Sequence, residues 1–198
     1  MDYVIGCDLG SQGVKVILLT AEGKLAGEAG VGYGIDYPHP TWADQPVSRW
    51  TDALCTAVRK LLQETGVSAE QIRAIGLDGQ VDGVVAVDAA GEALRPAIIW
   101  MDRRAVDQCN AVGKVRGTES IFQITGLNLD PSHVAAKIRW LADREPEVYR
   151  KLVSEYEDWN ATMLPISPQS STGPMGNGRQ LADHYGVVPP PRPANPPR

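Results

Sequence analysis

The stretch from residue 3 to residue 20, YVIGCDLGSQGVKVILLT, determines how the chain begins to fold. Two short apolar runs rich in β-branched residues, 3–9 and 14–20, flank the turn GSQG at 10–13. Runs of this kind on either side of a glycine-containing turn are typical of two strands in a hairpin. A third apolar run follows another turn, from residue 25 to about residue 33. We therefore expect the fold to open with a meander of three antiparallel strands.

Beyond the meander, helical and strand patterns alternate. Apolar residues recur at helical spacing from Val47 to about Thr65, with Ser48 as a candidate cap and Gly66 as a natural stop. Further strands are expected at 72–77, 84–87 and 97–100, and further helices at 102–112, 119–124 and 132–142. Strands first and interleaved helices later predict a layered α/β domain.

Composition argues against several classes of partner. The 198-residue chain has a formal net charge of −5, so it has no basic surplus to neutralise a nucleic-acid backbone. No apolar run reaches the roughly 18 residues of a membrane helix, and Asp2 stands where a signal peptide has basic residues. Cys7, Cys55 and Cys109 form no disulfide or zinc pattern. We expect a soluble, cytoplasmic protein that binds neither nucleic acid nor membrane.

The first hairpin turn carries groups suited to a phosphate. Glycines let backbone N–H groups approach an anion, a serine hydroxyl can donate to it, and a lysine can neutralise its charge. An acid at the end of the strand can hold a hydrated magnesium ion. The candidate cofactor-binding residues are Asp8, Gly10, Ser11, Gln12 and Lys15. The GxxxxGK spacing of a P-loop is absent, and a plain turn that binds nothing is the alternative.

A second cluster, GLDGQVDG at residues 76–83, crowds two acids and an amide at a glycine-rich strand end. Carboxylate and amide oxygens are well suited to hold vicinal hydroxyls, although a polar turn between two strands is the alternative. A third cluster, RPAIIWMDRRA at residues 95–105, places a tryptophan, an acid and two arginines between a strand and a helix. Asp102 also suits a helix N-cap, and Arg103 and Arg104 also suit a solvated helix face.

A fourth segment, TGLNLDPSHVAAKIRWL at residues 125–141, places Asp130 and Ser132 just before a helix. Either side chain can be a helix cap or a ligand. Lys137 and Trp140 are expected to anchor the helix.

These four segments resemble, in the same order, motifs of the FGGY family of carbohydrate kinases. The turn is similar to the DxGT phosphate motif of the sugar kinase, actin and heat-shock ATPase superfamily, with Ser11 and Gln12 where Thr and Thr or Ser are common. The others resemble SGQxHG, RPAIxWxDxR and TGxxxxPxxxxxKxxWL segments. The resemblance implies a ribonuclease H-like (actin-like ATPase) α/β domain, whose mixed sheet opens with the antiparallel meander and carries helices on its faces.

The resemblance also implies ATP and Mg²⁺ as cofactors and a sugar or polyol as substrate. Asp8 is the implied magnesium ligand, through water. Trp100 is expected to stack on the substrate, and Asp102 to bind hydroxyls or support the pocket. Val81 and Asp82 stand where xylulose kinases have Met-His and glycerol kinases have Arg-Glu, which fits a polyol but weakens an assignment to xylulose. The implied substrate-binding residues are Gln80, Val81, Asp82, Trp100, Asp102, Arg103 and Ser132.

The resemblance covers about residues 3–152, and we assign residues 1–152 to an incomplete kinase N-terminal domain. Nine of the 15 prolines lie after residue 152, so we expect 153–198 to be a disordered or aberrant tail. The family's catalytic base lies in a GxxDxxA-like segment, and none follows Trp140 here. The catalytic residue is therefore left unassigned, and we expect a gene truncated or frame-shifted near Leu152.

Two functions follow from these expectations. The first is the N-terminal portion of an ATP-dependent, xylulose kinase-like carbohydrate kinase, inactive alone. The alternative is a non-catalytic sugar-binding module or half-kinase, which pairs with a second copy or with a chain that supplies the missing C-terminal half.

Overall fold

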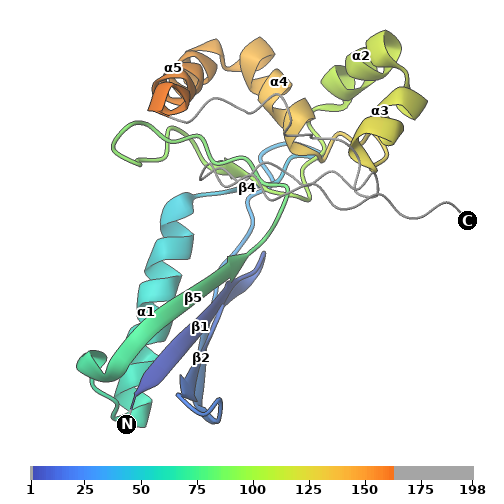
Figure 1. The fold of residues 1–198 in the computed structure, drawn as a ribbon. Helices are drawn as coiled ribbons and strands as arrows, with labels where there is room; N and C mark the ends of the chain where they lie inside the picture. Colours follow the sequence, from blue (N-terminus) through green and yellow to red (C-terminus); the bar gives the residue numbers. More distant parts are fainter. Residues whose placement is uncertain (1, 163–198) are drawn as a thin grey trace, which may run out of the picture.

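The computed structural model describes residues 2–162, and the side chains of this range up to residue 154. Figure 1 shows two parts, a sheet with one long helix below and a group of helices above. The strands are β1 (Tyr3–Leu9), β2 (Gly13–Thr20), β3 (Leu25–Gly32), β4 (Asp44–Gln45), β5 (Ile72–Gly79) and β6 (Ala97–Ile98). The helices are α1 (Val47–Thr65), the 3₁₀ turn η1 (Ala69–Gln71), α2 (Val106–Arg116), α3 (Thr118–Thr125), α4 (Val134–Arg144) and α5 (Pro146–Thr162).

The main sheet has the strand order β3-β2-β1-β5. β2 pairs antiparallel with both β1 and β3, so the predicted meander is confirmed. β5 returns after α1 and pairs parallel with β1, which makes the sheet mixed and confirms the expected fold class. Asp8 is the register partner of Lys15 on β2 and of Asp78 on β5. Because partners in adjacent strands point to the same face, these three side chains form a row across the sheet.

α1 packs on one face of the meander and forms the main core with it. The buried members are Ile5, Cys7, Val14, Val16 and Leu18 of the strands and Ala53, Ala57 and Leu61 of the helix. The strand members alternate in sequence, as a sheet with one covered face requires. α1 begins at Val47 and ends at Thr65, and it is followed by Gly66, which has the left-handed φ of +68° typical of a helix stop.

A second core joins the upper helices to the segment that precedes α2. It consists of Val84, Ile98, Ala105, Cys109, Ala136, Trp140 and Leu141. β4 and β6 pair antiparallel between the two parts, with Asp44 opposite Ile98. Residues on these two short strands therefore contact both the meander and the helices. No helix within residues 2–162 is long and apolar enough to cross a membrane.

Several local predictions were wrong. Ser48 lies inside the first turn of α1, whose N-cap is Pro46 without a side-chain cap bond. Residues 84–87 form only isolated bridges, between Val84 and Ile98 and between Val87 and Ala93. The helix expected from residue 102 begins at Val106, and the Asp102 carboxylate accepts from the distant Ala43 N–H and from the nearby Arg104 N–H.

α5 crosses the domain boundary that we predicted at residue 152. It runs from Pro146 to Thr162, and the sequence from residue 147 to residue 162 contains no proline. Proline suits the first turn of a helix, and the next one is Pro165, so the helix has no breaker at residue 152. The proline-rich part of the predicted tail, residues 163–198, lies outside the described residues.

Gly13 begins β2 where no side chain fits, so Gly13→Ala should destabilise the fold. A Cβ there would lie 2.7 Å from the carbonyl oxygen of Val31. We expect a loss of about 1–3 kcal/mol in the free energy of unfolding, as for other overpacked sites, measured in urea. Gly34→Ala is the matched control, because a Cβ at Gly34 would meet nothing within 4 Å. Equal stability of the two variants would contradict this account.

Candidate functional site

The turn between β1 and β2 forms one wall of an open groove. The Gly10 N–H donates to the Gly13 carbonyl at 3.0 Å, which closes the turn, and the Tyr33 hydroxyl donates to the Gly10 carbonyl at 2.5 Å. Burial, and then the nearby Asp8 carboxylate, raise the pKa of Tyr33, so this hydroxyl keeps its proton. The groove has a volume of about 410 Å³ and is lined by Asp8, Gly10, Gln12, Gly13, Val14, Lys15, Gly30, Val31 and Gly32.

The chemistry of this groove fits a phosphate and a hydrated cation. Six of the nine lining residues are glycine or valine on β2 and β3 or in the turn, so backbone dominates one wall. Lys15, Asp8 and Asp78 are exposed and lie in one row on the face away from α1. Mg²⁺ prefers oxygen ligands and keeps several waters, so two accessible carboxylates beside a glycine-rich wall suit it. Among the described residues, no group of three or more His, Cys, Asp or Glu side chains forms a dehydrated metal cage.

The predicted sugar-binding residues Trp100 and Gln80 lie against this turn. The Trp100 indole N–H donates to the Ser11 hydroxyl oxygen at 2.7 Å, and Trp100 is 46% exposed. The Gln80 backbone N–H donates to the Leu9 carbonyl at 3.1 Å, directly after β5 ends beside β1. The structure therefore brings the predicted phosphate segment and two predicted substrate segments together, although they are about 70 to 90 residues apart in sequence.

Gln45, which is not among the residues predicted from the sequence, joins these segments. It is fully buried, and its amide nitrogen donates to the carbonyls of Ser11 (2.8 Å) and Gly34 (3.1 Å). Its amide oxygen accepts from the Trp50 indole and from the Gln80 amide, both at 3.0 Å. No periodicity or spacing indicated this residue, because its partners come from four separate segments.

Val81 and Asp82 occupy the turn after Gln80. Val81 is 73% exposed, and Asp82 has a φ of +55°, which is uncommon for a residue other than glycine. The Lys137 ammonium donates to the Asp82 carbonyl at 2.6 Å and to the Ile99 carbonyl at 2.9 Å. Lys137 is fully buried, and burial lowers its pKa to about 8. Lys137 therefore holds the backbone of this turn, while the Asp82 side chain is exposed.

Asp102 is buried and turned into the protein. Its carboxylate accepts from the Ala43 N–H (2.6 Å), the Arg104 N–H (2.8 Å) and the Arg104 Nε (2.9 Å). Arg104 also pairs with Asp44 and lies over the Trp42 ring at 4.1 Å. Both carboxylate oxygens of Asp102 therefore bond within the protein.

Arg103 and Ser132 meet at Asp130. Arg103 makes a bidentate ion pair with the Asp130 carboxylate, with both distances 3.1 Å, and the Ser132 N–H donates to it at 2.8 Å. Hydrogen bonds from Ser132, followed by Arg103, lower the pKa of Asp130 to about 2. The structure thus places these two predicted substrate-binding residues in one cluster, with the Asp130 carboxylate between them.

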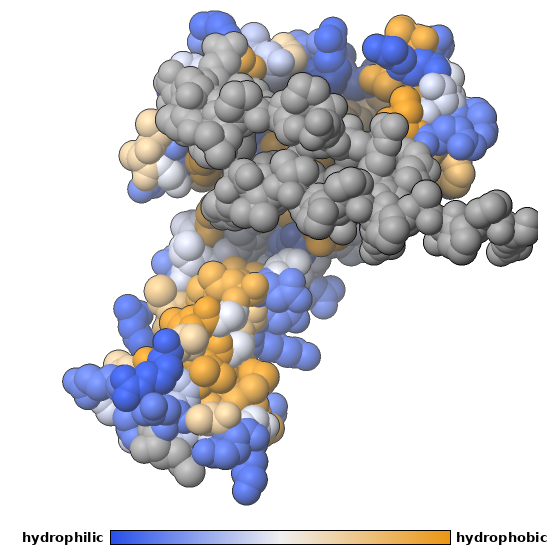
Figure 2. Space-filling model, viewed as in Figure 1, coloured by the Kyte–Doolittle hydropathy of each residue, from blue (hydrophilic) through white to orange (hydrophobic). Residues whose placement is uncertain are grey.

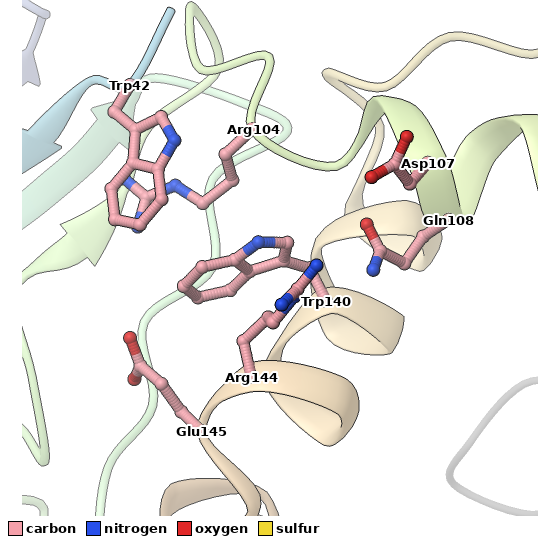
Figure 3. Close-up of a pocket in the computed structure, with 7 residues that line it drawn as sticks. All are labelled: Trp42, Arg104, Asp107, Gln108, Trp140, Arg144 and Glu145. Carbon is pink, nitrogen blue, oxygen red and sulfur yellow. The ribbon is translucent and has the colours of Figure 1, made fainter. Parts of the chain in front are cut away.

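A separate pocket of about 460 Å³ lies between α2 and α4 (Figure 3). It is lined by Trp42, Arg104, Asp107, Gln108, Trp140, Arg144 and Glu145. The Trp42 and Trp140 rings meet edge to face at 5.1 Å, and Arg104 lies against both. None of these residues belongs to the predicted phosphate or substrate set.

In this fold, the glycine-rich turn between two strands of a mixed sheet lies against a polar surface that carries Gln80 and Trp100. The model of the FGGY family of carbohydrate kinases, N-terminal domain, matches residues 3–162. The chain therefore belongs to the FGGY family of carbohydrate kinases. The match continues past our predicted limit at residue 152, to the end of α5.

Curated relatives and solved structures agree with this assignment. Xylulose kinase of Escherichia coli strain K12 is 35% identical over 148 residues, covering 75% of this chain and 30% of the relative. Glycerol kinase of Thermus brockianus is 34% identical over 196 residues, covering 93% of this chain and 39% of the relative. The crystal structure of a "xyloylose kinase" from Brucella ovis has a TM-score of 0.69 at 30% identity, covering 75% of this chain and 31% of that chain. The chain thus spans roughly a third of the length of these proteins.

The low pKa of Asp130 makes the free energy of unfolding depend on pH in the acid range. The folded pKa of Asp130, about 2, lies below its ordinary value of 3.8, so the unfolded chain binds the proton more readily. The contribution of Asp130 is complete above about pH 4 and is lost as the pH falls through about 2. We expect Asp130→Asn to flatten the loss of stability between pH 4 and 2 in thermal unfolding. Asp107→Asn, on the exposed start of α2, is the control, and equal profiles for the two variants would contradict the assignment.

Proposed function

We propose that this chain is the substrate-binding N-terminal portion of an ATP-dependent kinase that phosphorylates a hydroxyl of a sugar or polyol. The observation that carries the proposal is the hydrogen bond between Trp100 and Ser11. It joins a surface suited to hydroxyls to a turn suited to phosphates, and a kinase needs these two surfaces next to each other. The similarity to xylulose and glycerol kinases supports the same substrate class.

Each end of the site has a proposed role. In the complete enzyme, ATP supplies the phosphoryl group, and positioning and charge stabilisation do most of the catalytic work. Asp8 would hold the hydrated Mg²⁺, with Asp78 beside it, and Lys15 and the Ser11 turn would bind phosphoryl oxygens. Trp100 would stack on the apolar face of the substrate, and Gln80 would bind a hydroxyl. Val81, Asp82, Arg103 and Ser132 would shape the rest of the pocket.

The base that accepts the hydroxyl proton is not assigned to any residue of this chain. Asp102 and Asp44 are buried in ion pairs with Arg104, so neither carboxylate is available to a substrate in this arrangement. We therefore propose that the chain binds its substrate but does not turn it over by itself.

Calorimetry with xylulose and glycerol, and a coupled ADP-release assay on the same sample, test this proposal. We expect binding of at least one of the two without turnover. Trp100→Leu removes the indole face and the bond to Ser11, so its affinity should fall by about tenfold, or ~1.4 kcal/mol. Phe122→Leu, a similarly exposed aromatic on α3, should bind normally. Absence of binding to either compound would refute the proposed substrate binding, and turnover would refute the proposal that this chain lacks the catalytic base.

A second candidate, a half-kinase that needs a partner chain, rests on the open edge of the sheet. β5 pairs with β1 on one side and has no strand on the other side within residues 2–162. Ile75 and Leu77 of β5 are 56% and 66% exposed, whereas strands that pair in parallel are normally covered on both faces. Figure 2 shows apolar surface gathered over this part of the molecule. Such a surface suits association with further polypeptide.

Mixing tests this second candidate. The part of E. coli xylulose kinase that this chain does not span would be added to the chain, and ADP release measured with xylulose. We expect turnover to appear on mixing. Leu77→Lys should reduce it, because the substitution places a charge in the interface between β5 and the added polypeptide. Leu25→Lys, a similarly exposed leucine on the opposite edge strand β3, should have no effect. No complex by analytical ultracentrifugation would exclude the half-kinase.

A further inference from the structure

The Gln45 amide uses its full hydrogen-bonding capacity. A primary amide offers two donors on nitrogen and two acceptor positions on oxygen. The Gln45 nitrogen donates to the carbonyls of Ser11 and Gly34, and its oxygen accepts from Trp50 and Gln80. All four bonds are between 2.8 and 3.1 Å, and the residue is fully buried.

These partners allow only one orientation of the Gln45 amide. The Trp50 indole nitrogen can only donate, and the two backbone carbonyls can only accept. A flipped Gln45 would set donor against donor and acceptor against acceptor, and would leave buried groups unpaired. The atom of Gln45 that faces Gln80 is therefore its oxygen, and this follows from the chemistry of its neighbours.

The orientation of Gln45 in turn sets that of Gln80. Only the amide nitrogen of Gln80 can donate to the Gln45 oxygen, so the Gln80 carbonyl oxygen must point away from Gln45. That oxygen is buried and has no partner among the described residues. An unpaired carbonyl oxygen needs a donor, which a hydroxyl supplies and a phosphate or carboxylate anion does not.

Ser11 lies at the other end of the same hydrogen-bond network. Whereas the Gln80 oxygen needs a donor, the Ser11 hydroxyl has a proton to donate. Its hydroxyl oxygen accepts from the Trp100 indole at 2.7 Å, so its own proton is directed elsewhere and is available to an anionic oxygen. The Gln45 amide bonds to the Ser11 carbonyl and to the Gln80 side chain at once. One buried side chain thus connects a hydroxyl acceptor with a phosphate donor.

We propose that Gln45 is a positioning residue that holds the Gln80 carbonyl as the acceptor of a substrate hydroxyl, in fixed relation to the Ser11 turn. This inference rests on the proposed function, and it identifies the group that Gln80 recognises as a hydroxyl. Gln45 itself has no remaining donor or acceptor, so it acts on a bound polyol only through Gln80.

A double-mutant cycle tests whether Gln45 acts through Gln80. Titrations would use xylulose or glycerol, whichever the wild-type chain binds, with Gln45→Met, Gln80→Met and the double variant. We expect Gln80→Met to weaken binding by about two- to tenfold, the range for one lost hydrogen bond, and Gln45→Met to weaken it by somewhat less. The double variant should bind no more weakly than Gln80→Met, because the Gln45 contribution passes through Gln80. Additive losses would overturn the proposal.

Gln108→Met is the matched control. Gln108 is 6% exposed and donates to Asp143 at 3.1 Å, so it is also a buried, hydrogen-bonded glutamine, but it lies on α2. This variant should lose stability without losing affinity. If it weakens binding as much as Gln45→Met does, the effect of Gln45 is merely structural and the proposal fails.

NMR of the side-chain amide of Gln80 gives a readout that needs neither ligand nor variant. In the wild-type chain, the amide proton that Gln80 donates to Gln45 should exchange slowly with water. Fast exchange, as in a free glutamine, would overturn the proposal even if Gln45→Met failed to fold.

The outcomes separate this inference from the proposed function. If the wild-type chain binds no polyol, the proposed function fails, and the hydroxyl-accepting role of Gln80 fails with it. If the wild-type chain binds and Gln45→Met binds equally tightly, only the role of Gln45 is wrong.

Discussion

The buried pairing of Arg104 with Asp44 and Asp102 joins the two parts of this molecule. Asp44 lies on β4 of the short β4–β6 pair, and Asp102 precedes α2, so the guanidinium between them ties that pair to the segment that leads into the helices. The side chain of Arg104 is fully buried and lies against Trp42 and Trp140. Buried charges of this kind are costly to leave unpaired, so removing one of these side chains would leave a buried charge without its partner. Asp102 lies two residues after Trp100, whose indole N–H donates to the Ser11 hydroxyl.

Around this joint, the backbone is held by buried side chains. Lys137 donates to the carbonyls of Asp82 and Ile99, and the Asp102 carboxylate accepts from the Ala43 N–H. Backbone groups of an irregular segment have no partners in a helix or a sheet. Hydrogen bonds from buried side chains supply those partners instead. A polar surface beside the sheet therefore keeps one conformation, although most of it lies in loops.

The site divides by chemistry along the row of strands. Lys15, Asp8 and the glycine-rich wall suit an anion with a hydrated cation, whereas Gln80 and Trp100 suit a neutral ligand with hydroxyls and an apolar face. The short β1–β2 turn separates these two environments, and Ser11 belongs to both. The parallel pairing of β5 with β1 creates this arrangement, since it brings the end of β5 next to the phosphate turn.

The sequence by itself determined the meander, the limits of α1 and the family motifs, because these depend on local patterns. Alternating apolar residues define β1 and β2, helical spacing and Gly66 define α1, and the motifs are contiguous. The tertiary structure alone decided that Asp102 turns inward, that Asp78 lies beside Asp8, and that Gln45 links Ser11 to Gln80. Those facts depend on which segments meet in space, and a polar residue in a loop carries no periodic signal of its partners. The continuation of α5 past residue 152 was missed for a related reason. The predicted tail was treated as one proline-rich segment, although its prolines begin only at Pro165 and its first ten residues contain none.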